Sequence, residues 1–332
     1  MKYLEWSLFA VGAALLIFLI YTTGIDTLYS DIVLIGWGFL FVLGQELIAQ
    51  TANTLGWRFA ISPEKRTIPF RRLLLFRIAG DGINNFTPTA TIGGEFVRAR
   101  LIQPYVGGKE GASSVTIAKF AEACGLTVFI AVGFLLVLPF IDELGSFRWI
   151  MLGIVLGFVI ILAVLLMLFK KGFFRITSST VSSIGIAKKW IAGYAEHIEN
   201  IDATISRCTG KRRKDLVLAG ICFTVGYCCT LIEIWAILYF LELPTNWYLI
   251  IGIEALAVLI DAVTFLVPFK IGTQEGGKML IFKIFSLDPA KGLAMGVIQR
   301  GREVFWSSIG LAIYASLMTS AEKKPAAPNI VE

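Results

Sequence analysis

Two segments of the chain carry ionisable and helix-breaking residues in the same order. The first segment reads DGINNFTPTATIGGEFVR and the second reads DAVTFLVPFKIGTQEGGK. Each has an Asp, six residues, a Pro, six residues, a Glu, two residues and a cation. The matched residues lie 180 positions apart: Asp81 with Asp261, Pro88 with Pro268, Glu95 with Glu275, and Arg98 with Lys278. This shared register predicts an internal repeat.

The two segments are suited to holding an anion. Proline removes a backbone donor and glycine permits a tight turn, so we expect each segment to end one helix and begin another. The free amides at the start of a helix favour a phosphate or a carboxylate, and an Arg fork matches phosphate oxygens. Further along each half, a cation and a Glu match again at an offset of 181. They are Lys119 and Glu122 in the first half, and Arg300 and Glu303 in the second.

The predicted substrate-binding residues come from these segments and from the two cation and Glu pairs. They are Asp81, Asn84, Asn85, Pro88, Gly93, Gly94, Glu95, Arg98, Lys119, Glu122, Asp261, Pro268, Gly272, Glu275, Lys278, Arg300 and Glu303. Ionisable residues within apolar sequence are expected to be functional. Each cation and Glu pair has i,i+3 spacing, however, so its two charges can also simply neutralise each other. For Glu46, Glu233 and Glu254, which have no matched partner, a buried hydrogen-bonded role and coupling to protons or ions both stay open.

The composition excludes several kinds of catalytic site. His197 is the single histidine, so this chain alone cannot assemble a Ser-His-Asp triad or a multi-histidine metal site. The sequence contains neither a GxxxxGK[ST] loop nor a GxGxxG loop to hold a nucleotide. The five cysteines include no CxxC pair and are not the pattern of a disulfide-bonded secreted domain. We therefore expect no cofactor, no metal site and no catalysis of the soluble type.

The apolar composition predicts an integral membrane protein. Of 332 residues, 56% are apolar and 16% are charged, and the mean hydropathy is +0.76. A helix needs about 20 apolar residues to cross a bilayer core of about 30 Å. Five stretches meet this length, at 6–23, 32–52, 115–139, 149–169 and 216–241, and three more, at 68–103, 247–285 and 292–319, are apolar but interrupted. The net charge of +6 is modest, so nucleic acid is not an expected partner.

The charges of the connections predict an orientation, because loops rich in Lys and Arg stay in the cytoplasm. Residues 57–77 and 170–214 are basic and are predicted to be cytoplasmic, whereas 24–31, 140–148 and 242–246 are predicted to face outward. Apolar residues near 184–201 recur at helical spacing, which is typical of a helix on the membrane surface. Residues 321–332 are predicted to be a disordered tail. Both termini are then cytoplasmic, in the inner membrane of a prokaryote.

The predicted fold is an all-α polytopic membrane protein made of two inverted repeats. Residues 1–145 form the first repeat and residues 146–320 form the second, each with three spans and a broken re-entrant hairpin. An odd number of crossings turns the second copy upside down, so the two broken elements enter from opposite faces and are expected to meet near the midplane. The alternative is that both elements cross fully, which gives eight spans and parallel repeats.

The stretch NNFTPTATIGGEFVRARLI, the later VPFKIGTQEGG and the Arg-x2-Glu of Arg300 resemble the transmembrane region of the lysylphosphatidylglycerol synthase family. That family includes stand-alone, flippase-like relatives. The resemblance implies a translocator of phosphate-bearing lipids, such as aminoacylated phosphatidylglycerol or isoprenoid phosphates. The residues that correspond by position to the family's first element are Pro88, Gly93, Gly94, Glu95 and Arg98. Those that correspond to its later elements are Pro268, Gly272, Glu275 and Arg300. The synthases also have a soluble aminoacyl-transferase domain that has no counterpart here, so no synthase activity is expected.

These observations predict a lipid transporter, or flippase, that binds the head group of an anionic phospholipid or isoprenoid phosphate between the two broken elements. Glu95 and Glu275 are expected to position the cations or to compete for them between two access states. The alternative is a membrane enzyme in which Glu95 with Glu275, or Asp81 with Asp261, acts on a lipid phosphate, with carboxylates able to hold Mg²⁺. A third hypothesis is a non-catalytic scaffold. Association into a homo-oligomer stays open.

Overall fold

The computed structural model describes residues 17–86, 92–137, 212–263 and 270–322, with a few single positions elsewhere. Every regular element within these residues is a helix, which confirms the predicted all-α class. The elements are α2 (Ile25–Ile35), α3 (Gly38–Ala60), η1 (Pro63–Lys65), α4 (Phe70–Phe86), α5 (Ile92–Val106), α6 (Gly108–Val137), α10 (Arg213–Phe240), α11 (Trp247–Val263), α12 (Thr273–Ile284) and α13 (Pro289–Glu322).

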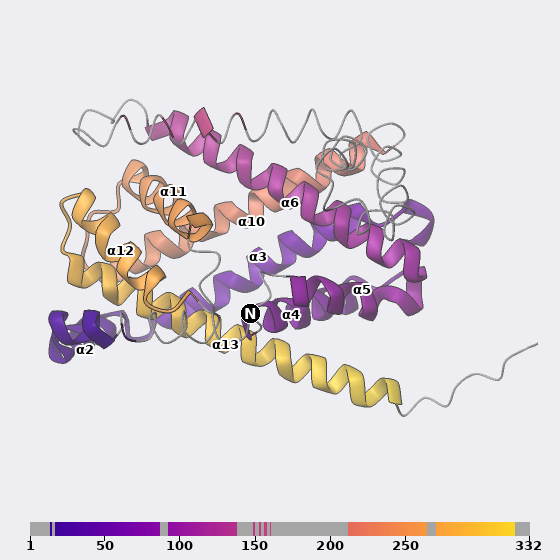
Figure 1. Cartoon of the computed structure of the whole chain (residues 1–332), viewed down its shortest axis with the longest axis horizontal. Helices are drawn as coiled ribbons and strands as arrows, with labels where there is room; N and C mark the ends of the chain where they lie inside the picture. The colour runs from indigo at the N-terminus through magenta and orange to yellow at the C-terminus, as the bar shows by residue number, and fades with distance from the viewer. Residues whose placement is uncertain are drawn as a thin grey trace, which may run out of the picture.

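Four long helices, α3, α6, α10 and α13, form the body of the molecule (Figure 1). α3 packs against α10, and α6 packs against both of them. Two helical segments, Gly108–Leu136 in α6 and Arg213–Phe240 in α10, are long and apolar enough to cross a membrane, as predicted for 115–139 and 216–241. On α10, Val217, Ile221 and Val225 point out of the bundle. Exposed apolar side chains on a long apolar helix suit a surface that faces lipid.

The beginning of the chain differs from the prediction. Residues 24–31 were expected to be a connection, but α2 begins directly after Gly24, and it meets Ile17–Thr23 at an angle of 91°. The predicted span 32–52 is interrupted at Gly36, where φ is 44°, so that α2 ends at Ile35 and α3 begins at Gly38. Glycine adopts positive φ at little steric cost, which permits a break within an apolar run. A hydropathy average does not detect such a break, so the end of α2 and the beginning of α3 were predicted as one span.

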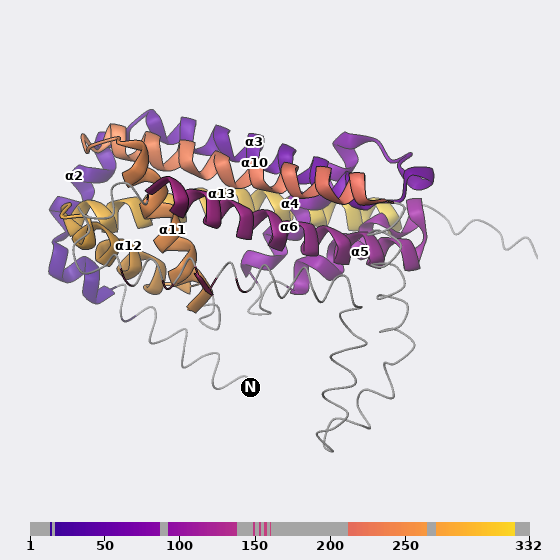
Figure 2. The same cartoon turned by 90° about the horizontal axis from the view of Figure 1, so that it is seen from above.

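Two helical hairpins lie toward opposite ends of the bundle (Figures 1 and 2). α4 packs against α5, and α11 packs against α12. The hairpins contain the two segments that share the repeated pattern, although Pro88 and Pro268 lie outside the described residues. Each hairpin also packs against a long helix of the other half, because α4 contacts α13 and α11 contacts α6. Each half of the chain therefore supports the hairpin of the other half.

Glycine allows α4 and α13 to approach closely. A Cβ on Gly82 would lie 2.8 Å from the carbonyl oxygen of Ser307, and a Cβ on Gly310 would lie 2.4 Å from that of Ile78. Small residues of this kind let the backbones of membrane helices come together. The approach brings polar groups into contact, since Asn85 donates a hydrogen bond to the hydroxyl of Ser307 at 2.7 Å.

Several predictions fall wholly or largely outside the described residues. They are the spans 6–23 and 149–169, the connections 140–148 and 170–214, the surface helix near 184–201 and the tail beyond residue 322. The division of the chain into two repeats at residue 145 also stays a prediction.

Candidate functional site

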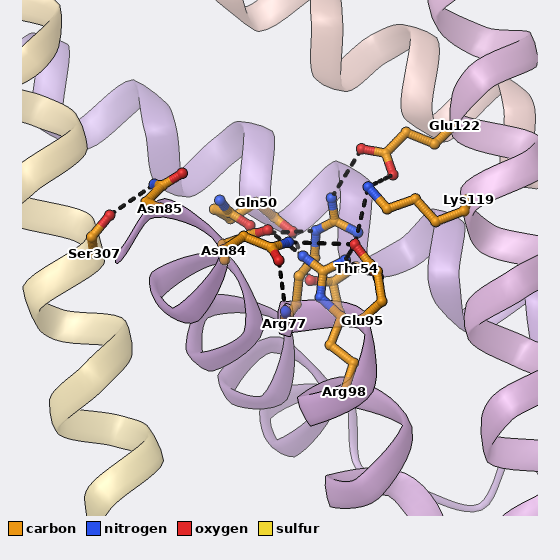
Figure 3. Close-up of polar contacts among 12 residues, drawn as sticks. Gln50, Thr54, Arg77, Asn84, Asn85, Glu95, Arg98, Lys119, Glu122 and Ser307 are labelled. Carbon is orange, nitrogen blue, oxygen red and sulfur yellow. Dashed lines mark hydrogen bonds and ion pairs between the residues drawn. The ribbon is translucent and has the colours of Figure 1, made fainter. Parts of the chain in front are cut away.

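The first ion cluster is formed by six charged side chains of α4, α5 and α6 (Figure 3). The cluster consists of Arg77 and Asp81 of α4, Glu95 and Arg98 of α5, and Lys119 and Glu122 of α6. The guanidinium of Arg98 contacts Asp81 and lies 2.9 Å from Glu95 Oε2. Lys119 Nζ lies 3.0 Å from Glu95 Oε1 and 3.0 Å from Glu122 Oε2. Five of the predicted site residues thus come together.

Arg77 completes this cluster and was not among the predicted site residues. The sequence groups it with the cations of the basic connection 57–77, but the structure places it inside α4, 3.7 Å from Glu122 and 3.8 Å from Asp81. The side chains of Arg77 and Arg98 are each only 4% exposed. The cluster has three cations and three carboxylates, and every cation has a carboxylate within salt-bridge distance. Buried charges are tolerated when they are paired in this way.

Asn84 fixes the start of α5 against α4. Its side-chain oxygen accepts a hydrogen bond from the Gly94 amide at 2.6 Å, and its amide nitrogen donates to Glu95 at 3.4 Å. A Cβ on Gly94 would lie 2.1 Å from the carbonyl oxygen of Gly80, so the two helices cross where neither residue has a side chain. The expectation that amides at this helix start are free to bind an anion is therefore wrong for Gly94.

The second ion cluster is formed around α12 by Asp261 of α11, Lys270, Glu275 and Lys278, and Arg300 and Glu303 of α13. Arg300 lies 3.0 Å from Glu275 and 2.8 Å from Glu303. Asp261 is paired with Lys270 at 2.8 Å. Gln274 joins the two pairs, because it donates to Asp261 at 3.2 Å and accepts from Arg300 at 2.9 Å.

The start of α12 is also closed by the protein itself. Gly272 precedes the helix with a φ of 74°, and its amide donates to Glu275 Oε2 at 2.8 Å. Glycine is suited to this position because an L side chain rarely adopts such a φ. As with Gly94 in the first hairpin, the amide of Gly272 is satisfied by a protein group.

The two clusters share one arrangement. In the first, Lys119 of α6 contacts both Glu95 and its own i+3 neighbour Glu122. In the second, Arg300 of α13 contacts both Glu275 and its own i+3 neighbour Glu303. The predicted i,i+3 pairs therefore form, and each cation also reaches the Glu of the adjacent hairpin.

Lys278 is the residue at which the second ion cluster differs from the first. It matches Arg98 in sequence, yet it forms no salt bridge and no side-chain hydrogen bond with any residue in the described part of the chain, although it is only 8% exposed. The carboxylates that match the partners of Arg98 are engaged elsewhere, Asp261 by Lys270 and Glu275 by Arg300. Lys278 is thus a buried cation with carboxylates nearby but none bonded to it.

Lys278 lines a cavity of about 110 Å³ between α10, α11, α12 and α13, which we call the α12 cavity. A smaller cavity of about 50 Å³ lies between α3, α4 and α13 and is lined by Glu46, Asp81 and Asn85, among others. Arg302 and Glu303 line both cavities. The two hairpins are therefore connected through α13. The centres of the two broken elements lie outside the described residues, so their direct meeting stays a prediction. Close contacts at Gly292, Gly296 and Gly310 allow α13 to pack against both of them.

Arg302 lines both cavities and lies between them. It was not among the site residues predicted from the sequence. Its guanidinium contacts Glu46 of α3 and lies 2.9 Å from Glu233 of α10, which is fully buried. The sequence did carry a signal, because two unmatched acids and an Arg inside apolar stretches must find partners in a membrane. Arg302 thus gives Glu46 and Glu233 a structural role that the repeat pattern could not supply.

The pairs of acids that an enzymatic role requires are not formed. Glu95 and Asp81 belong to the first ion cluster, and Glu275 and Asp261 belong to the second. Each of these carboxylates is engaged by a cation. Among the described residues, no group of three or more His, Cys, Asp or Glu side chains is placed to hold a metal ion.

Comparison with known proteins agrees with the predicted transmembrane character of the chain. Residues 6–310 match the family described as the lysylphosphatidylglycerol synthase TM region. The chain is also 24% identical to a UPF0104 membrane protein of Methanothermobacter thermautotrophicus over 293 residues, which cover 84% of this chain and 85% of that protein. No solved structure matches the chain. The match spans nearly all of the described helices, and the chain therefore belongs to the family of the lysylphosphatidylglycerol synthase transmembrane region.

Proposed function

We propose that this protein moves an anionic, phosphate-bearing lipid across the membrane and binds its head group at Lys278. The single observation that carries the proposal is a buried ammonium group that lines the α12 cavity and has no bonded partner among the described residues. A buried ammonium group without a hydrogen-bond acceptor is costly, so such a group is expected to have a ligand. The phosphate oxygens of a head group would supply the acceptors that Lys278 lacks among the described residues.

The α12 cavity has the size and lining for part of a head group. Its volume of about 110 Å³ exceeds the roughly 30 Å³ that one water molecule occupies. Gln274, Gln299 and Thr230 add neutral polar groups to the wall, and Ile260 and Ile281 add apolar ones. A lining with a few polar groups among apolar ones is typical of sites for small ligands.

We infer that two inverted repeats carry this site, as they do in many secondary transporters. Two observations support the repeat. Lys119 and Arg300 have matching partners, and the two hairpins pack reciprocally, α4 on α13 and α11 on α6. Rocking of one half against the other would then shift α13, and Arg302 would exchange Glu46 or Glu233 for the lipid phosphate as the head group passes from one cavity to the other.

We place the basic connections on the cytoplasmic side of a prokaryotic inner membrane. The connection after α3 and the residues before α10 lie together, since Arg66 is 2.6 Å from Asp215 and Arg212 donates to the carbonyl oxygen of Ile61 at 2.6 Å. The residues after α3 and the first residues of α10 therefore lie at the same end of the bundle, which supports a cytoplasmic location for both basic connections under the positive-inside rule.

Reconstitution tests the proposal. Liposomes that contain the purified protein and fluorescent phosphatidylglycerol are expected to expose the inner-leaflet label to external dithionite faster than empty liposomes. Lys278→Met should slow this movement at least tenfold, whereas Lys283→Met, an exposed lysine on the same helix, should leave it unchanged. Movement no faster than in empty liposomes, for labelled phosphatidylglycerol and for a labelled isoprenoid phosphate, would contradict the proposal.

A further inference from the structure

The charges around the two cavities are not balanced in the way that those of the first ion cluster are. The second ion cluster, Arg302 with its two bonded acids, and Glu254 of the α12 cavity together contain four cations and six carboxyl groups. The cations are Lys270, Lys278, Arg300 and Arg302, and the carboxyl groups are Glu46, Glu233, Glu254, Asp261, Glu275 and Glu303. Six ionised carboxylates beside four cations would be costly in a protein interior, and adding an anionic head group would increase that cost. A proton on a carboxyl group lowers this cost.

Glu254 is the carboxyl group placed to exchange such a proton. It is only 8% exposed, lines the α12 cavity with Lys278, and forms no salt bridge or hydrogen bond with any residue that the structure describes. The other acids that line this cavity are engaged, Asp261 by Lys270 and Glu303 by Arg300. Glu254 and Lys278 are thus two buried, unbonded groups of opposite charge in the wall of one cavity.

We propose that Glu254 is a proton-binding site coupled to the occupation of Lys278 by an anionic head group. The inference rests on the proposed function. In the empty cavity, the carboxylate of Glu254 balances the ammonium of Lys278. When a phosphate binds Lys278, Glu254 takes up one proton from water, an O–H bond forms on its carboxylate, and the cavity keeps its charge. When the head group leaves, the proton returns to water.

The surroundings of Glu254 favour this coupling over a fixed protonation state. The residues of α6 that face α11, such as Phe129 and Phe134, are apolar. The titratable and charged groups around Glu254 are Tyr227 and Glu233 on α10, Asp261 on α11, Lys278 on α12, and Arg302 and Glu303 on α13. Of the cations in this set, Arg302 is bonded to Glu46 and Glu233, and only Lys278 is unbonded among the described residues. Occupation of Lys278 therefore changes the field at Glu254 most directly.

Proton uptake on binding is the measurement that tests the coupling. The purified protein in weakly buffered detergent is mixed with short-chain dihexanoyl phosphatidylglycerol, and a pH indicator follows the protons. We expect uptake of about one proton per lipid bound near neutral pH, and by linkage a Kd that weakens by up to about tenfold per pH unit as the pH rises. Glu254→Gln should bind the lipid without proton uptake and with a Kd independent of pH. Glu64→Gln, which removes an exposed carboxyl group, should behave like the wild type.

The outcomes separate this inference from the proposed function. Binding that depends on Lys278 but takes up no proton between about pH 6 and pH 9 would overturn the coupling and leave the lipid site intact. Absence of any Lys278-dependent binding by the wild-type protein would overturn both. Should Glu254→Gln not fold, the infrared difference spectrum of the wild-type protein decides, because a new protonated-carboxyl band on lipid binding is expected and its absence would contradict the coupling.

Discussion

The first and second ion clusters have the same framework and differ in the bonding of one cation. In both, a cation on a long helix contacts the Glu of a hairpin and its own i+3 Glu. In the first, Arg98 is bonded to Asp81 and Glu95, whereas in the second the matched Lys278 has no bonded partner among the described residues. Lys270 and Arg300 engage the two carboxylates that Lys278 would otherwise use.

This difference indicates that the two ion clusters have different roles. In the first ion cluster every cation is paired with a carboxylate, and the pairs tie three helices together. The second ion cluster leaves a cation and the carboxyl group of Glu254 in the wall of a cavity. A repeated pattern has thus produced a structural network in one half and a candidate binding site in the other.

Removing a cation of the first ion cluster should have the largest effect on stability. Arg98→Met leaves the partly buried Asp81 and Glu95 without their main partner, and we expect the free energy of unfolding to fall by about 3–5 kcal/mol. Chemical unfolding in detergent measures this loss. Arg100→Met, which alters an exposed cation of the same helix, should change stability little. Equal losses in the two variants would show that the first ion cluster is not a structural network.

Arg302 should have an intermediate effect, because it stands between two acids from different helices. Arg302→Gln should cost about 2–3 kcal/mol, since Glu233 is fully buried and loses the guanidinium beside it. The double variant Arg302→Gln with Glu233→Gln should recover part of this loss, which a double-mutant cycle measures. Strictly additive losses would mean that the pair does not act as a unit.

Lys278→Met should have the smallest effect on stability, in contrast with Arg98→Met. Replacing a buried, unbonded ammonium with an apolar side chain, while Glu254 takes up a proton, should leave the free energy of unfolding within about 1 kcal/mol of the wild type, or raise it. The same unfolding measurement applies, and lipid movement should nevertheless slow at least tenfold. A destabilisation as large as that of Arg98→Met would indicate that Lys278 is a structural partner and that the two clusters are alike.

The spacing in the sequence predicted which charges gather, but it could not predict how they pair. The i,i+3 spacing correctly joined Lys119 to Glu122 and Arg300 to Glu303, because i,i+3 neighbours share one face of a helix. The partner of Asp261 depends on Lys270, which stands in a break between helices and belongs to no repeated pattern. Competition among carboxylates and cations is decided by the packed helices, so the unbonded state of Lys278 could be seen only in the structure.

Arg302 shows a second limit of the sequence argument. It lies two residues after Arg300, and two residues turn an α-helix by about 200°, so the two cations point to nearly opposite sides of α13. Arg300 faces α12, and Arg302 faces α3 and α10. In the sequence RGRE the charges lie close together, but on the helix Arg300 and Arg302 contact different neighbouring helices.

A structure of the protein in a bilayer that contains an anionic phospholipid tests the central claim most directly. We predict head-group density in the α12 cavity, with phosphate oxygens within hydrogen-bond distance of Lys278 Nζ and with Arg98 still bonded to Asp81 and Glu95. An α12 cavity without lipid density, with Lys278 bonded to a carboxylate of the protein, would contradict the account.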